Sequence, residues 1–128
     1  FWTFNYDNVP DAQMRVLEKR FGDWLTKKHG SLDAAFAAWN APHQRDNTGE
    51  GRAGFMPLWE VFNKRDARAQ DTAQFLTLDQ KRFFEETQKY LKDDLQFKGV
   101  TYASNWVTAD ARILGPLDKY SNTVADIM

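Results

Sequence analysis

Apolar residues recur at three- and four-residue steps through most of the first 98 positions, which is the spacing of one face of an α-helix. Pro10 suits the first turn of a helix and Gly30 suits the residue just past its end, so together they predict a helix over residues 11–29. The same spacing predicts further helices over residues 32–40, from Pro57 onward and over about residues 69–95. The chain up to residue 98 is therefore expected to be mainly helical.

The run "APHQRDNTGEGRAG", residues 41–54, interrupts this pattern. It contains one proline and three glycines with few apolar residues, a composition that is typical of turns. We expect an exposed and mobile loop here.

The pattern changes again after residue 98. "FKGVTYAS" is rich in strand-forming residues, and "TVADIM" is a second apolar run, with a short helix or loop between them. Residues 99–128 are therefore predicted to form strand, helix and strand. Two strands joined by a helical crossover lie parallel in a sheet that is buried on both faces, which requires more strands than this chain supplies.

Both ends of the chain are apolar, with Phe1 and Trp2 at the start and Met128 last. An independent domain usually has polar surface segments at its termini. We therefore expect residues 1–128 to be a single segment of a larger α/β domain, with residues 1–98 as its helical part and residues 99–128 as its strand-containing part.

Composition narrows the classes of partner. The 128 residues carry a formal net charge of -1, so no excess of basic residues attracts nucleic acid or an anionic membrane, and neither partner is expected. No apolar run approaches the roughly 20 residues needed to cross a bilayer. The absence of cysteine and the wide separation of the 2 histidines predict no metal site, and nothing in the chain indicates a cofactor.

Three stretches of the sequence resemble one enzyme family. "RFGDWLTKKHGSLDAAFAAWN", "FFEETQKYLKDDLQFKGVTYASNW" and "NTVADIM" are similar, in this order, to segments of (β/α)8-barrel glycoside hydrolases between the fourth and sixth barrel strands. The resemblance covers almost the whole chain. It implies an α/β fold that forms part of a TIM barrel, a carbohydrate ligand, and a secreted or periplasmic location.

The resemblance also implies that the catalytic groups lie outside this chain. Glycoside hydrolysis requires two carboxylates, and in the family the acid/base Glu follows an Asn at the end of the fourth strand, while the nucleophile Glu ends the seventh. No Asn-Glu pair occurs in this sequence. We therefore assign no catalytic residue and expect the chain alone to be inactive.

The candidate sugar contacts are Asn105, Trp106 and Trp2. Asn105 and Trp106 follow the first predicted strand, where an indole ring offers an apolar plate to a sugar and an amide offers a donor and an acceptor to its hydroxyls. The alternative is that Trp106 packs under the crossover and Asn105 caps a turn. Trp2, with Phe4 and Tyr6, could form a sugar-stacking platform or could equally be core residues of a divided domain.

Two functional hypotheses follow. In the first, the chain is the sugar-binding segment of a glycoside hydrolase, and its partners are an oligo- or polysaccharide and the remainder of the barrel. In the second, it is a stand-alone helical binding or interaction module whose aromatic residues form only a core. Self-association through unpaired strands is a further possibility.

Overall fold

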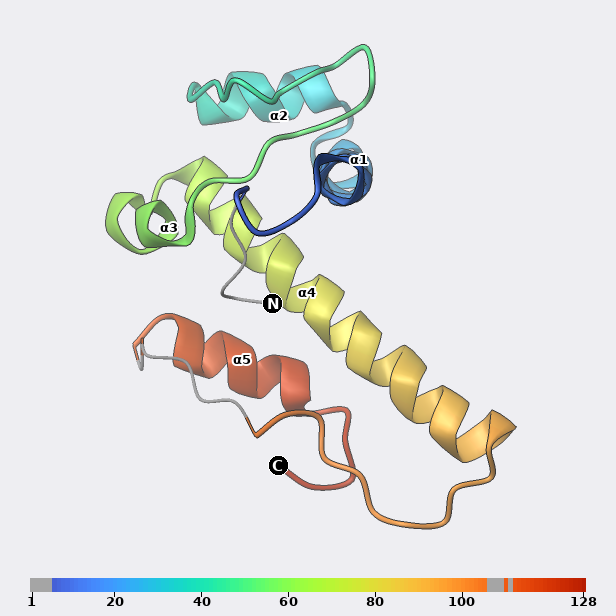
Figure 1. The fold of residues 1–128 in the computed structure, drawn as a ribbon. Coiled ribbons are helices and arrows are strands. Elements are labelled where there is room, and N and C mark those ends of the chain that lie inside the picture. The colour runs from blue at the N-terminus through green and yellow to red at the C-terminus, as the bar shows by residue number, and fades with distance from the viewer. Residues whose placement is uncertain (1–5, 106–109, 111) are drawn as a thin grey trace. The chain divides into compact units, whose positions relative to one another are not determined.

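The computed structural model describes residues 6–105, 110 and 112–128, and this part of the protein is predominantly helical (Figure 1). Its helical elements, in chain order, are α1 Asp11–His29, α2 Leu32–Trp39, α3 Leu58–Lys64, α4 Ala67–Lys89, the π-helical turn η1 Tyr90–Asp94 and α5 Leu114–Asn122. The chain divides into two compact units, Phe1–Phe75 and Leu76–Met128, and α4 contributes to both. The helices expected before residue 98 are confirmed, and α1 has the predicted bounds.

The corner between α1 and α2 is set by two adjacent residues. Gly30 ends α1 with a φ of 88°, a conformation that favours glycine, and its amide donates to the carbonyl of Thr26 at 2.9 Å. Ser31 then begins α2, because its Oγ accepts a hydrogen bond from the amide of Ala34 at 3.0 Å. These two hydrogen bonds end α1 and begin α2 within two residues.

The core of the N-terminal unit is a stack of aromatic rings. Phe21 of α1 lies at the centre, with its ring centroid 4.8 Å from that of Phe55 and 4.9 Å from that of Phe75. All three side chains are buried, as are Leu25 and Trp39. Because Phe55 comes from the segment after α2 and Phe75 comes from α4, the stack joins three parts of this unit.

The expectation of an exposed loop at residues 41–54 is confirmed for residues 42, 44 and 48–50, which are exposed, but is wrong for residues 52–54, which are buried. Arg52 and Ala53 are buried, and Asn47 and Arg52 form an isolated antiparallel bridge that closes a tight turn between them. The fully buried carboxylate of Glu18 in α1 accepts hydrogen bonds from Arg45 and, at 2.7 Å, from Arg52. Composition indicated a turn, but burial is set by these ion pairs with a helix that is distant in sequence.

The C-terminal unit is organised by a polar contact between α4 and α5. Gln80 of α4 donates from its Nε2 to the Oδ1 of Asp118 at 3.0 Å and to the Oγ of Ser121 at 2.6 Å. All three residues are buried, and Leu76 and Leu114 add buried apolar surface. These hydrogen bonds fix the rotation of α5 about its own axis.

The predicted α/β fold class, with two short strands near the C-terminus, is wrong for this chain. Across the described residues the structure contains no strand, and the one strand-like pairing of residues 99–105 with residues 123–128 is an isolated parallel bridge between Tyr102 and Ile127. Val100 and Tyr102 are 70% and 60% exposed, so the alternating apolar residues have no second sheet face to cover them. A strand requires backbone partners along its length, and here a side chain, that of Asp126, takes up the amide of Thr101. Nothing in the structure supports a TIM barrel.

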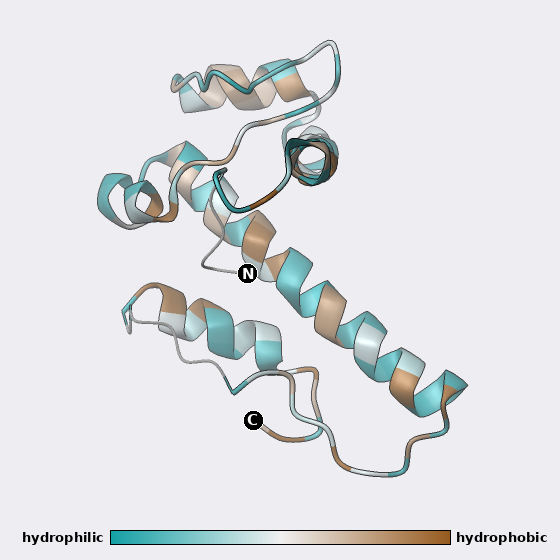
Figure 2. Ribbon diagram, in the orientation of Figure 1, coloured by the Kyte–Doolittle hydropathy of each residue, from teal (hydrophilic) through white to brown (hydrophobic). Residues whose placement is uncertain are grey.

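Figure 2 shows both brown and teal positions along α4, so this long helix has apolar and polar sides. None of the helices in the described ranges combines the length and the hydrophobicity that a bilayer crossing needs.

Candidate ligand-binding cavity

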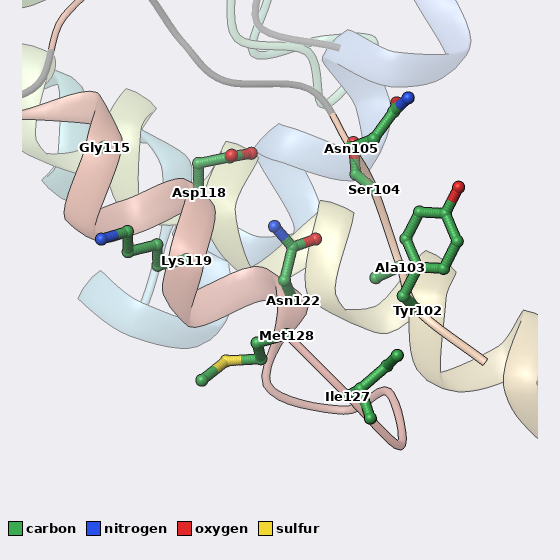
Figure 3. A pocket seen from close by; sticks show the side chains of 10 residues that line it. All are labelled: Tyr102, Ala103, Ser104, Asn105, Gly115, Asp118, Lys119, Asn122, Ile127 and Met128. Carbon is green, nitrogen blue, oxygen red and sulfur yellow. The ribbon is translucent and has the colours of Figure 1, made fainter. Parts of the chain in front are cut away.

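A cavity of about 650 Å³ lies within the C-terminal unit. Its walls are formed by residues 102–105, by one side of α5, and by Ile127 and Met128 (Figure 3). Small-molecule sites commonly have volumes of roughly 300–1,000 Å³ and mainly apolar walls with a few polar groups. This cavity therefore has the size and character of a ligand site.

The α5 wall results from helical spacing. Asp118 and Lys119 lie three and four residues after Gly115, and Asn122 lies four and three residues after them, so all four positions share one side of the helix. Gly115 leaves room, whereas Asp118 and Asn122 provide hydrogen-bonding groups in successive turns. The α5 wall is therefore open near Gly115 and carries polar side chains at Asp118 and Asn122.

The start of α5 is held by Asp110. One oxygen of its carboxylate, Oδ1, accepts hydrogen bonds from the amides of Ile113 at 2.5 Å and Leu114 at 3.0 Å. These backbone donors hold the pKa of Asp110 below its ordinary value, because they favour the ionised form. The ionised carboxylate therefore fixes where the wall of the cavity begins.

Asp118 is the most firmly oriented polar group of the cavity. Its side chain is buried, with Oδ1 bound by Gln80 as described above. In Figure 3 its carboxylate extends toward the segment that carries Ser104. A carboxylate held in one orientation is ready to accept hydrogen bonds from ligand hydroxyls without further ordering.

Asn122 has unused hydrogen-bonding capacity. Its Oδ1 is buried and has no hydrogen-bond partner among the residues that the structure describes. Such an atom costs about 1–3 kcal/mol in a folded protein. Water does not reach this oxygen, so a ligand in the cavity would bind it only after the Asn122 side chain had turned toward the cavity. On another wall of the cavity Tyr102 presents a ring that is 60% exposed.

The predicted sugar contacts have different outcomes. Asn105 does line the cavity, although it is exposed and Figure 3 shows its amide pointing away from α5. Trp106 and Trp2 lie outside the described residues. Asn105 stays a predicted contact at the rim of the cavity, and the roles predicted for the two tryptophans stay predictions.

Sequence reasoning missed Asp118, Asn122 and Tyr102 as site residues. The four-residue interval between Asp118 and Asn122 was a usable signal, because it places two polar side chains on the same side of any helix through residues 114–122. The interval alone does not identify the segment of the chain that lies opposite this side of the helix.

A second polar cluster lies in the N-terminal unit, around the buried carboxylate of Asp71. It accepts hydrogen bonds from Lys28 at 2.7 Å, from the indole of Trp39 at 2.7 Å, and pairs with Nε2 of His29 at 2.8 Å. Burial alone raises the pKa of Asp71, but these three partners outweigh it and hold the pKa below its ordinary value. The cluster ties α1, α2 and α4 together.

Asp118 is the one side-chain carboxylate that lines the cavity within the described ranges, whereas hydrolysis of a glycoside uses two. Within the same ranges, no group of three or more His, Asp or Glu side chains is placed to hold a metal ion.

Comparison with protein-family models, with curated protein sequences and with solved structures finds no significant match to this chain.

Proposed function

We propose that the C-terminal unit binds a small carbohydrate in this cavity, as the sugar-binding and non-catalytic segment of a glycoside hydrolase. The observation that carries the proposal is the meeting of three side chains in the lining of one cavity: the carboxylate of Asp118, which Gln80 binds, the amide of Asn122 and the aromatic side chain of Tyr102. The assignment to a glycoside hydrolase rests on the resemblance of "GVTYASNW" to that family, although residues 99–105 form no strand here.

The chemistry of these groups suits a sugar. Each sugar hydroxyl is both a donor and an acceptor, so it pairs with a carboxylate that accepts and with an amide that does both. The C–H face of a sugar ring is apolar and packs on an aromatic ring such as that of Tyr102. The mainly apolar remainder of the wall, which includes Ile127 and Met128, would cover the carbon skeleton.

A titration with three neutral disaccharides tests the proposal. Cellobiose, xylobiose and maltose would be added to the ¹⁵N-labelled chain, and the ¹H–¹⁵N correlation spectrum would be followed. We expect at least one of them to shift the side-chain amide signal of Asn122 together with the backbone amides of residues 102–105. Shifts confined to the N-terminal unit, or no shift with any of the three sugars, would contradict the proposal.

Replacing Asn122 separates binding from stability. In Asn122→Leu the buried unpartnered oxygen is removed, so the free energy of unfolding should not fall, while sugar affinity should weaken about threefold to tenfold through the lost hydrogen bonds. The matched control is Asn63→Leu on α3, which removes an exposed amide from the other unit and should leave affinity unchanged. If Asn122→Leu binds as tightly as the wild type, Asn122 is not a sugar contact.

The alternative function, a helical interaction module, is favoured by a different observation. Large apolar side chains on the C-terminal unit are exposed, among them Phe83 at 62% and Val100 at 70%. If they mediate self-association, sedimentation velocity should show an apparent mass that rises with protein concentration, and Phe83→Ser together with Val100→Ser should abolish the rise. A constant monomer mass over micromolar to millimolar concentrations would remove this alternative.

A further inference from the structure

The carboxylate of Asp126 joins three parts of the C-terminal unit. It accepts hydrogen bonds from the amide and the Oγ1 of Thr101, at 2.8 and 2.9 Å, and it forms an ion pair with the Nζ of Lys92 in η1 at 2.9 Å. A weaker hydrogen bond of 3.3 Å comes from Gln88 in α4. One side chain near the end of the chain therefore binds the segment after η1, η1 itself and α4.

This junction lies directly beside the cavity. The next residue, Ile127, forms the bridge with Tyr102, and its amide donates to the carbonyl of Thr101 at 3.2 Å. Tyr102 and Ile127 both line the cavity. Thr101 and Asp126 each directly precede one of these two wall residues in the sequence. Their hydrogen bonds therefore hold Tyr102 and Ile127 in register.

We propose that Asp126 is the positioning residue of the cavity, holding Tyr102 and Ile127 in the arrangement that receives the ligand, and that protonation of its carboxylate releases them. This inference rests on the proposed function, since it assigns to Asp126 control over that same site. Asp126 does not line the cavity and acts through its neighbours.

The contacts at this junction depend on the negative charge of the Asp126 carboxylate. Lys92 and both donors of Thr101 favour the ionised carboxylate and lower the pKa of Asp126 from 3.8 to about 2. Because the pKa in the folded chain lies below that in the unfolded chain, the stabilisation is complete above about pH 4 and is lost as the pH falls through about 2. Among the described residues, the groups that face Asp126 are Lys92, Thr101 and Gln88, of which Lys92 is the charged one.

The first test requires no ligand. In the wild type, the amide proton signal of Thr101 should titrate with a midpoint near pH 2, following the carboxylate to which it donates. In Asp126→Asn this titration should vanish, whereas Asp94→Asn, which removes the same charge from η1, should retain it. A Thr101 signal that does not titrate in the wild type, or that titrates equally in Asp126→Asn, would overturn the positioning role.

The second test measures binding, with cellobiose, xylobiose and maltose as probes. Asp126→Asn should weaken the affinity of any disaccharide that the wild type binds by about threefold to tenfold, Asp126→Glu should restore part of it, and Asp94→Asn should match the wild type. Equal affinity in the wild type and Asp126→Asn would overturn the inference and leave the proposed function standing. If the wild type binds none of the three sugars, the proposed function is overturned, and with it the control of binding by Asp126. In that case the Thr101 titration alone decides whether Asp126 forms the junction.

Discussion

Replacing Arg68 by Ala should lower the free energy of unfolding of the N-terminal unit by about 3–5 kcal/mol, the range found when one partner of a buried ion pair is removed. Arg68 is 2% exposed, and its guanidinium binds both carboxylate oxygens of Asp46, at 2.8 and 2.7 Å. It also donates to the backbone carbonyls of Ala41 and Gly54, each at 2.6 Å, and lies 4.6 Å from the ring centroid of Trp39. The substitution would leave the largely buried carboxylate of Asp46 with the amides of His43 and Gly54 as donors but without its counterion, and would remove a donor from two carbonyls.

Urea denaturation followed by tryptophan fluorescence would measure this loss. Arg68→Lys should recover less than half of it, since an ammonium group cannot reproduce the planar fork that binds Asp46 with two bonds. The control is Arg15→Ala, which removes an arginine that is about half exposed and pairs with Asp11, and it should unfold close to the wild type. An Arg68→Lys variant as stable as the wild type would show that charge alone, without the four directed hydrogen bonds, holds this segment.

Gly22→Ala should also destabilise the N-terminal unit, by about 1–3 kcal/mol or more, although it replaces a glycine inside a helix. Helix propensity alone predicts the opposite, a gain of about 1 kcal/mol. The reason is steric, because a Cβ at position 22 would lie 2.1 Å from the carbonyl oxygen of Gly51. That oxygen is backbone and belongs to the tight turn that residues 47 and 52 close, so the turn would have to move away from α1.

The sign of the change in unfolding free energy decides between the two expectations. Gly49→Ala is the matched control, since it lies in the same turn and its Cβ would approach no closer than 3.4 Å to the Asn47 side chain. We expect Gly49→Ala to stay within about 0.5 kcal/mol of the wild type. If Gly22→Ala proved more stable than the wild type, α1 and the turn would not be in contact in solution.

The helices of this chain were predictable from sequence because their signals are local. Pro10, Gly30 and Ser31 mark helix ends through their own backbone and side-chain chemistry, whatever the rest of the chain does. The error at residues 99–104 has the opposite origin. Those residues have the composition of a strand, but a strand exists only if a distant segment supplies partners, and here Asp126 supplies a side chain instead.

The site was predictable only in part, for a related reason. Asn105 was predicted as a sugar contact because it follows the first expected strand; it does line the cavity, although that strand is absent from the described residues, and its role as a sugar contact stays a prediction. Asp118 and Asn122 become site residues through the rotation of α5, which is fixed by Gln80, 38 residues earlier in the chain than Asp118. Likewise, Arg52 is buried despite the loop-like composition around it, because it pairs with the buried Glu18, 34 residues earlier in the chain. Side-chain contacts between residues so far apart in the chain produce no periodic pattern in the sequence.

The continuity of α4 across the two units has a consequence for the order of folding. Starting a helix is costly, because several residues must be ordered before the first hydrogen bond forms, whereas extending one is not. The N-terminal unit ends at Phe75, inside α4, so once that unit has folded it presents a finished helical turn to Leu76 and the residues that follow. The C-terminal unit can then grow from an existing nucleus, and we expect the walls of its cavity to assemble last.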